Sequence, residues 1–301
     1  MKPLRVPSAP GVLDRSSELR QSPEEMAKLW QSAKIIHIAR QRFLVADGEL
    51  RFLNSNEIAN LDKKFSNGLK IFLGVVEGRS YFAYCTDVES GLAESFDSGE
   101  DKEYLSLREV DKRFSEFSIA ICMQAQAISN WHHTHPKCAK CGMETAAEKG
   151  GYVRICKSCG AEHFPRVDPA IIVLLRDRDD RIILGRQKVW PEKRFSCFAG
   201  FVEPGESFEQ AVAREVLEEA GVLVSEINYL TSQPWPFPAS LMISFEAITD
   251  NPELVRPDGE EIEAIKILSR SEFESEIANE ELLLPPKVSV ARKMIEAWRR
   301  A

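Results

Sequence analysis

Four glutamates lie close together in one short segment of the chain, and their spacing is suited to binding a cation. Glu215, Glu218 and Glu219 follow one another at intervals of three and one, and Glu206 lies nine residues earlier. Side chains three and four apart are neighbours on a helix, so the first three carboxylates would share one sector. Crowded like charges near a helix C-terminus are destabilising unless a cation compensates them. Hard carboxylate oxygens favour Mg²⁺ or Mn²⁺, and the alternative is an acidic face in water.

The segment that carries these glutamates is predicted to be a loop followed by a helix. Pro204-Gly205 marks a turn, and Ser207 with Gln210 fits a capping box, so the helix should begin at Ser207. Gly221 fits the position just past its end. Arg214, four residues before Glu218, can pair with it. Five apolar residues are expected to face the core: Val212, Ala213, Val216, Leu217 and Ala220.

Four of the seven cysteines form two pairs with zinc-site spacing: Cys138 with Cys141, and Cys156 with Cys159. Two thiolates from each tight turn complete a tetrahedral sulfur site that is closed to water and substrate. We therefore expect one structural Zn²⁺ that stabilises a segment too small to build its own core. A redox pair or disulfides are the alternatives.

The other histidines and cysteines near these motifs are expected to have no chemical role. The run from His132 to His135 lies just upstream of the first pair, but four thiolates already fill a tetrahedral site. These histidines are predicted to be polar surface or helix-end residues. Cys85, Cys122 and Cys197 stand alone in apolar stretches and are predicted to be small buried thiols.

Residues 232–240 read SQPWPFPAS and form a second unusual segment. Three prolines and two aromatic residues do not suit the centre of an ordinary strand. They suit a rigid rim on which a flat ring can stack, or a proline-rich turn with buried aromatic side chains.

The glutamate segment resembles the signature of the Nudix hydrolases at every position. The matching residues are Gly200, Glu206, Arg214, Glu215, Val216, Glu218, Glu219, Gly221 and Val222. The resemblance implies an α/β/α sandwich with a mixed sheet that cleaves nucleoside diphosphates linked to another moiety, using divalent cations. It implies three catalytic residues: Glu215 and Glu219 would hold metal, and Glu218 would be a further ligand or the water-activating base.

The same resemblance implies supporting roles for residues around the signature. The backbone carbonyl of Ala199 would bind metal, Glu206 would order the loop, and Arg214 would orient a glutamate. A downstream glutamate would be a further metal ligand. Both Glu260 and Glu261 are candidates, and counting back from Glu263-Ala264 favours Glu260.

The segment SQPWPFPxS after this signature, a zinc ribbon before it and an extra N-terminal domain together resemble the NADH pyrophosphatase branch of the family. The branch implies a set of substrate-binding residues: Phe164, Gln233, Pro234, Trp235, Pro236, Phe237, Pro238, Ala239, Ser240 and Ala291. Phe164 stands where the branch commonly has Tyr; it keeps the stacking face and loses the hydroxyl donor.

The branch implies hydrolysis of NADH or NAD⁺ to nicotinamide mononucleotide and AMP with two or three Mg²⁺ or Mn²⁺. It also implies decapping of NAD-capped RNA to 5′-monophosphate RNA, and a homodimer. One alternative is a Nudix enzyme for another dinucleotide, such as ADP-ribose or diadenosine polyphosphate, which SQPWPFPxS disfavours. The other is a non-catalytic, nucleotide-sensing zinc-ribbon module, which the intact signature disfavours.

Three segments must position these residues: an α+β (Nudix-like) domain over 1–135, the zinc ribbon over 136–165, and a mixed α/β Nudix hydrolase domain over 166–301. In the first segment we expect an irregular arm over 1–22, helices over 23–33 and 115–132, a strand over 34–39, hairpins over 42–53 and 71–85, and an acidic solvated loop over 87–103. In the last we expect strands over 169–177, 181–187, 241–249 and 263–268, and a helix over 285–300 with Pro at its start.

Composition limits the class of protein further. The chain has 301 residues, 44% of them hydrophobic, which is enough for about two domains with a sizeable core. Its formal charge of −8 argues against a broad, sequence-independent grip on nucleic acid, but not against a phosphate substrate bound through a cation. No apolar run reaches the ~20 residues of a membrane span, and no signal peptide is recognisable. A soluble cytoplasmic protein is therefore expected.

Overall fold

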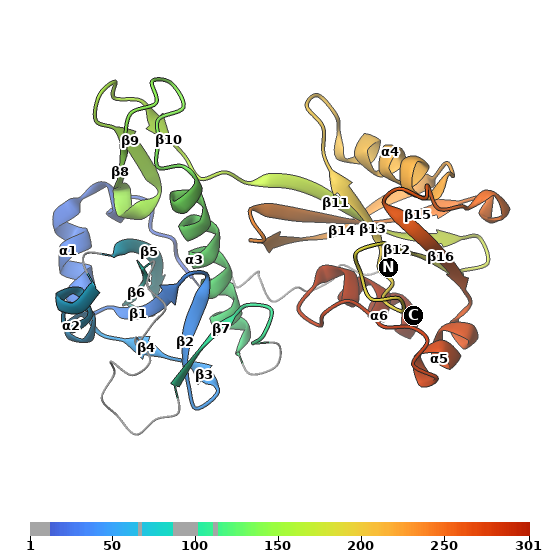
Figure 1. The fold of residues 1–301 in the computed structure, drawn as a ribbon, viewed down its shortest axis with the longest axis horizontal. Helices are drawn as coiled ribbons and strands as arrows, with labels where there is room; N and C mark the ends of the chain where they lie inside the picture. Colours follow the sequence, from blue (N-terminus) through green and yellow to red (C-terminus); the bar gives the residue numbers. More distant parts are fainter. Residues whose placement is uncertain (1–12, 66–67, 87–101, 111–113) are drawn as a thin grey trace. The chain divides into compact units, whose positions relative to one another are not determined.

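The computed structural model describes residues 13–65, 68–86, 102–110 and 114–301. Its chain divides into two compact units (Figure 1). Of the described residues, the N-terminal unit contains those from 13 to 167 together with Trp235–Ala239. The C-terminal unit contains Asp168–Pro234 and Ser240–Ala301. The short segment Trp235–Ala239 thus belongs to a different unit from the residues that flank it in sequence.

The N-terminal unit is built on a seven-stranded sheet with helix α3 against strand β5. The sheet runs β3-β2-β1-β6-β5, with β4 beside β1 and β7 beside β2. Its elements are η1 (Leu19–Gln21), α1 (Pro23–Gln31), β1 (Lys34–Ala39), β2 (Arg42–Ala46), β3 (Glu49–Leu50), β4 (Phe52–Leu53), α2 (Ser55–Phe65), β5 (Leu69–Val76), β6 (Arg79–Thr86), β7 (Lys102–Ser106) and α3 (Glu116–Thr134).

Both predicted hairpins are confirmed, because β2 pairs with β3 across Asp47-Gly48 and β5 pairs with β6 across Glu77-Gly78. Positive φ angles at all four of these turn residues explain the Asp-Gly and Glu-Gly sequences. Of the acidic loop predicted over 87–103, residues 87–101 lie outside the described residues. Its last two residues are in strand β7, so the prediction is wrong there. Of the predicted arm, residues 1–12 also lie outside the described residues.

The ribbon is a three-stranded sheet in the order β10-β9-β8. It comprises β8 (Thr145–Glu148), the short 3₁₀ helix η3 (Lys149–Gly151), β9 (Val153–Cys156) and β10 (Glu162–His163). Few of its residues are fully buried, which agrees with a segment that cannot build a core from its own side chains.

The C-terminal unit is a six-stranded mixed sheet between two helical layers (Figure 1). Strand β11 lies inside the sheet, and its alternate residues face opposite sides. Ile171 and Val173 pack with helix α4, whereas Ile172 and Leu174 pack with α5 and α6. The elements are β11 (Asp168–Asp177), β12 (Ile182–Gln187), β13 (Phe198–Phe201), α4 (Phe208–Ala220), β14 (Ser225–Trp235), β15 (Ser240–Thr249), η4 (Pro252–Leu254), β16 (Ile262–Leu268), α5 (Arg270–Ala278) and α6 (Val290–Arg300).

The predicted strands and α/β/α layering are therefore confirmed, with one correction to the start of a helix and three elements that were not predicted. Helix α6 begins at Val290 after the N-cap Ser289, and not at the prolines of the predicted range. Strands β13 and β14 and helix α5 were not predicted. Ser232 to Trp235 are the last residues of β14, and an edge strand tolerates Pro234 because its N–H side need not pair. None of the described helices combines the length and apolar character that a membrane crossing requires.

Candidate functional site

The two Cys-x-x-Cys turns bring their four sulfur atoms together, all within 4.8 Å of one another. Cys138 Sγ lies 3.7 Å from Cys159 Sγ, and Cys141 Sγ lies 3.5 Å from Cys156 Sγ. Each turn closes in the same way: the glycine after the second cysteine, with φ near 70°, donates its N–H to the carbonyl of the first. Both turns therefore aim two thiols at one point, which suits a tetrahedral thiolate site.

Two histidines near the ribbon have defined partners. His132 is buried, and it bonds to the carbonyl of Gly151 through Nε2 and to Arg154 through Nδ1, each at 2.7 Å. Burial lowers its pKa to about 4. His132 is thus a helix-end residue of α3, as predicted, but it is not a surface residue, and it links α3 to the ribbon. His163, which the sequence analysis did not single out, lies 3.3 Å from Cys138 Sγ through Nε2.

The loop-to-helix prediction for the glutamate segment is confirmed. Ser207 caps α4, and Ser207 and Gln210 exchange side-chain and backbone hydrogen bonds in a capping box. Gly221 ends the helix with a φ of 71°. Gly200, on the neighbouring strand β13, is required for a different reason. A Cβ atom there would lie 2.0 Å from the carboxylate of Glu215, so only glycine lets the strand pass this side chain.

The buried face of α4 differs from the predicted one. Leu217 is 47% exposed, and Ala211 is fully buried. Glu219 is only 3% exposed. It lies seven residues after Val212, so the two share one face of the helix. The expectation that the glutamates occupy a sector apart from the core is therefore wrong for Glu219.

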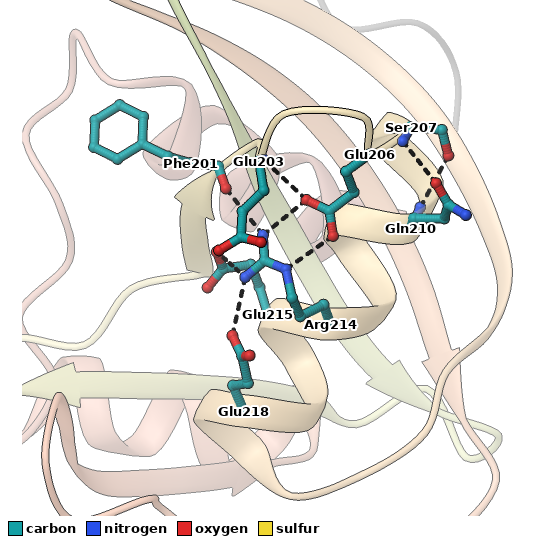
Figure 2. A network of polar contacts seen from close by, with 8 residues as sticks. All are labelled: Phe201, Glu203, Glu206, Ser207, Gln210, Arg214, Glu215 and Glu218. Carbon is teal, nitrogen blue, oxygen red and sulfur yellow. Dashed lines mark hydrogen bonds and ion pairs between the residues drawn. The ribbon is translucent and has the colours of Figure 1, made fainter.

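Arg214 is the centre of the polar network in this segment (Figure 2). Its guanidinium donates two hydrogen bonds to Glu206, at 2.8 and 2.9 Å, and one each to Glu215 at 2.7 Å and Glu218 at 2.9 Å. A further bond reaches the carbonyl of Phe201 at 3.0 Å. The guanidinium thus fixes the loop and two glutamates at once, and its charge offsets three carboxylates.

Glu219 has no such partner. Its Oε2 atom is buried and accepts no hydrogen bond from the described residues. Burial and the nearby charges of Glu261 and Glu215 raise the pKa of this carboxyl to about 8, against a backbone hydrogen bond from Ala199. An orphaned carboxylate oxygen among other acidic groups is what a cation would satisfy, so these residues fit a divalent metal.

The carboxylates nevertheless do not form a tight cluster. Within the described ranges, the four cysteines are the one group of three or more candidate ligand residues whose ligand atoms lie this close. Glu218 points outward, with 59% of its side chain exposed, and Glu215 is held by Arg214. The structure therefore brings Glu215, Glu219 and Ala199 into one neighbourhood without a completed ligand shell.

Of the two downstream candidates, Glu261 is the one whose charge acts on the site. Its charge contributes to the raised pKa values of both Glu219 and Glu215. Gln187 donates a hydrogen bond of 2.7 Å to Glu261. Sequence reasoning missed Gln187, because its pairing with residues near Glu261 depends on the β12–β16 register, which shifts between Arg186 and Gln187.

Residues 232–240 do not lie together on one surface. Gln233 is fully buried, and its side chain donates to the carbonyl of Val288 at 2.8 Å and accepts from the N–H of Val290 at 2.7 Å. It therefore fixes the start of α6. Trp235 and Phe237 are partly exposed, with ring centroids 5.0 Å apart, edge to face. The remaining members are Ser232 and Ser240, partly exposed in β14 and β15, exposed Pro234 and Pro238, buried Pro236 and partly exposed Ala239.

The two other predicted substrate contacts have opposite environments. Phe164 is 63% exposed, just after the ribbon, and its ring face is available. Ala291 is 4% exposed and packs in the core between α6 and the sheet. Any contact of Ala291 with a ligand is therefore limited to a small part of its surface.

Comparisons with known proteins agree with this architecture. The NUDIX domain family matches residues 166–296, and the NADH pyrophosphatase zinc ribbon domain matches residues 133–164. The ribbon match and the four-cysteine cluster together indicate a structural zinc site. A Nudix domain thus follows a zinc ribbon in one chain.

Relatives extend the similarity to nearly the whole chain. The NAD-capped RNA hydrolases NudC of Mycobacterium bovis and Mycobacterium tuberculosis are each 39% identical over 296 residues, which is 95% of this chain and 92% of theirs. The human NAD-capped RNA hydrolase NUDT12 is 36% identical over 200 residues, 62% of this chain and 43% of that protein. The chain belongs to the Nudix hydrolase family, in the branch with the NADH pyrophosphatase zinc ribbon, and is an enzyme.

Proposed function

We propose that this enzyme hydrolyses the diphosphate bond of NADH or NAD⁺ to nicotinamide mononucleotide and AMP. We propose the same cleavage on NAD-capped RNA, which leaves a 5′-monophosphate end. The observation that carries the proposal is the buried carboxylate of Glu219, with its unpartnered Oε2 atom, within an intact Nudix signature. The substrate class is supported by the names of the mycobacterial and human relatives.

We assign the catalytic metal to Glu215, Glu218 and Glu219, with the backbone of Ala199 and one of the two downstream glutamates, Glu260 or Glu261. When bound, two or three Mg²⁺ or Mn²⁺ ions would neutralise charge on the diphosphate and lower the pKa of a bound water. The charge of Glu261 at Glu219 favours it over Glu260. The ribbon cysteines would hold one Zn²⁺, which has no part in the reaction because four thiolates leave no open position.

The chain's own residues supply the rest of the chemistry. Glu218 is exposed and on the same helix as the two buried glutamates, so it can accept the proton of the attacking water. The oxygen of that water bonds to one phosphorus, and the bridging P–O bond breaks. Arg214 orients Glu215 through their hydrogen bond and opposes the rise in the pKa of Glu215 that burial causes. Glu206, which accepts the N–H of Glu203, keeps the loop before the helix in place.

For the substrate, we assign ring stacking to Trp235, Phe237 and Phe164, whose rings are at least partly exposed. Gln233 and Ala291 are buried and would shape the pocket from within. We also infer a homodimer and a cytoplasmic location, and both rest on the family resemblance. Sedimentation of the purified protein and fractionation of cells test them.

A direct comparison of substrates tests the proposed function. The protein is incubated with NADH, NAD⁺, ADP-ribose and NAD-capped RNA, each with Mg²⁺ or Mn²⁺, and kcat/KM is compared. We expect turnover of the three nicotinamide-containing substrates above that of ADP-ribose. If none of the four substrates is turned over, the proposal is refuted. A preference for ADP-ribose would place the enzyme in another Nudix substrate class.

A further inference from the structure

Two of the five residues Trp235–Ala239, which we call the aromatic turn, are prolines and have no backbone N–H. The N–H of Phe237 is used within the turn, 2.7 Å from the carbonyl of Trp235. Pro236 is buried. A buried carbonyl group needs a donor, and neither proline nor Phe237 has a free N–H to offer.

Two amide side chains of helix α3 supply those donors. The Nδ2 group of Asn130 lies 3.0 Å from the carbonyl oxygens of both Pro236 and Pro238. The Nε2 group of Gln126 lies 3.4 Å from the carbonyl of Pro236. These partners are carbonyls that can only accept, so the amide nitrogen of each side chain must face the turn. The two hydrogens of the Asn130 amide therefore match two acceptors.

This arrangement is costly to the fold. Asn130 and Gln126 are 7% and 1% exposed, and their amide oxygens are buried without a partner among the described residues. Each unpartnered buried oxygen costs free energy of folding. Apolar residues at these two positions, packed against a turn of a different sequence, would avoid that cost. Asn130 and Gln126 both leave a buried oxygen unpartnered, and both bond to the aromatic turn. This cost at two residues with the same partner points to a role in positioning the turn.

A third contact holds the aromatic turn from another element. The guanidinium of Arg108 lies over the ring of Phe237, 4.6 Å from its centroid. Arg108, Gln126 and Asn130 all belong to the unit that contains the turn. Arg108 thus contacts the Phe237 ring from outside the turn, and the two amides hold the carbonyls of the turn's prolines.

We propose that Asn130 and Gln126 are positioning residues for substrate selection. By holding the carbonyls of Pro236 and Pro238, they fix the Trp235 and Phe237 rings at the angle that stacks a nicotinamide ring. This inference rests on the proposed function and deepens it. A ligand with the nicotinamide ring depends on the two amides, whereas one that lacks the ring, such as ADP-ribose, does not.

Gln124 offers a matched control on the same helix. It is a glutamine, 8% exposed, and donates to the carbonyl of Leu73 at 2.8 Å and the hydroxyl of Tyr152 at 2.6 Å. None of its bonds reaches the aromatic turn. Replacing Gln124 therefore removes a comparable buried amide without touching Trp235 or Phe237.

The test compares Asn130→Asp, Asn130→Ala, Gln126→Ala and Gln124→Ala in the full-length protein. The aspartate keeps the size of asparagine and loses both donor hydrogens. Dissociation constants for NAD⁺ and ADP-ribose are measured by calorimetry without added divalent metal, and KM and kcat with Mg²⁺. For the Asn130 variants we expect NAD⁺ affinity to fall and KM to rise about tenfold, or ~1.4 kcal/mol, with kcat and ADP-ribose affinity within about twofold.

Gln126→Ala should show the same selectivity change at about threefold, because its bond is longer, and it decides the question if the Asn130 variants do not fold. Gln124→Ala should lower the melting temperature and leave the NAD⁺ to ADP-ribose ratio unchanged. If the ratio of NAD⁺ to ADP-ribose affinity is the same in all variants, or changes as much in Gln124→Ala as in the others, the amides only stabilise the fold. A wild-type protein that binds both ligands equally would also overturn the inference. Selective binding without hydrolysis would instead refute the proposed function alone.

Discussion

The four-cysteine ribbon and the glutamate segment are both candidate metal sites, but their side chains are positioned in different ways. In the ribbon, two local turns hold four thiols within 4.8 Å of one another. In the glutamate segment, Arg214 bonds to Glu206, Glu215 and Glu218, and Glu219 is left buried with an unpartnered oxygen.

The difference separates a metal that is part of the fold from a metal that takes part in a reaction. In a closed sulfur site, metal binding and folding of the segment are coupled, so the ion stays bound while the segment is folded. A site in which an internal arginine offsets only part of the carboxylate charge can gain and lose cations without unfolding. One carboxylate that remains unsatisfied then provides the affinity for the incoming ion.

The largest effect is expected from breaking the ribbon site. Cys156→Ser removes one of four thiolates, and we expect loss of bound zinc and a fall in stability of ~5 kcal/mol, because zinc binding and folding of such segments are linked. Zinc content and thermal unfolding measure this. Cys85→Ser, a thiol outside the ribbon, is the control and should retain full zinc. A Cys156→Ser protein with wild-type zinc content would contradict the closed four-thiolate site.

The glutamate site should respond in activity and not in fold. Glu219→Gln keeps the shape of the buried side chain and removes its charge, so we expect kcat/KM to fall about 10³-fold, or ~4 kcal/mol of transition-state stabilisation. Zinc content should be unchanged. The comparison between the two sites breaks down if this variant loses zinc, or if it keeps wild-type activity with Mg²⁺.

The pH dependence of stability sharpens the same contrast. The pKa of Glu219 is raised to about 8 in the folded protein, from an ordinary value of 4.5. The folded chain therefore keeps a proton that the unfolded chain loses between these values, so stability falls as pH rises through this window. Without divalent metal, Glu219→Gln should be more stable than wild type at pH 9 by up to ~3 kcal/mol, with little difference at pH 4.5.

Thermal unfolding of both proteins across pH 4.5–9, with zinc bound and no Mg²⁺ added, tests this expectation. Adding Mg²⁺ should restore the wild-type protein at high pH and leave the glutamine variant unchanged. Parallel pH curves for the two proteins would mean that Glu219 is not destabilised by burial.

What could be read from the sequence in these two regions depended on how local the interactions are. The cysteine turns and the Ser207 capping box involve residues three apart in sequence, and both were predicted correctly. The exposure of Leu217 and the burial of Glu219 depend on which side of α4 meets the sheet. Periodicity alone did not fix that rotation, because alanines and valines mark more than one side of this helix.

Long-range partners were the part that sequence could not supply. Asn130 and Pro236 are 106 positions apart, and no local pattern links a helix residue to a proline-rich turn. The burial of Gln233 against α6 has the same cause, since its partners Val288 and Val290 lie more than 50 positions away. The sequence identified the aromatic segment as unusual, but not the side chains that hold it.

The arginine that balances the glutamates should have a smaller effect than Glu219. Arg214→Gln frees Glu206, Glu215 and Glu218 from one cation, and we expect kcat/KM to fall about 30-fold, or ~2 kcal/mol, because the glutamates lose their orientation. Arg214→Lys should recover only part, since an ammonium cannot bind Glu206 with two parallel bonds. Steady-state kinetics with varied Mg²⁺ measure this, and equal activity of all three proteins would remove Arg214 from the positioning of the site.

The smallest expected effect distinguishes Glu261 from Glu260 as the downstream metal ligand. Glu261 contributes to the raised pKa of Glu219 and accepts a hydrogen bond from Gln187. The backbone N–H groups of Glu260 and Glu261 both bond to Asp258, so that contact does not distinguish the two. Glu261→Gln should therefore raise the Mg²⁺ concentration for half-maximal activity about tenfold, or ~1.4 kcal/mol, and Glu260→Gln by less than about twofold. Gln187→Leu should give an intermediate shift, because it frees Glu261 without removing its charge. A larger shift for Glu260→Gln than for Glu261→Gln would favour Glu260, the residue indicated by counting back from Glu263-Ala264. It would also mean that the segment after Asp258 rearranges when the cation binds.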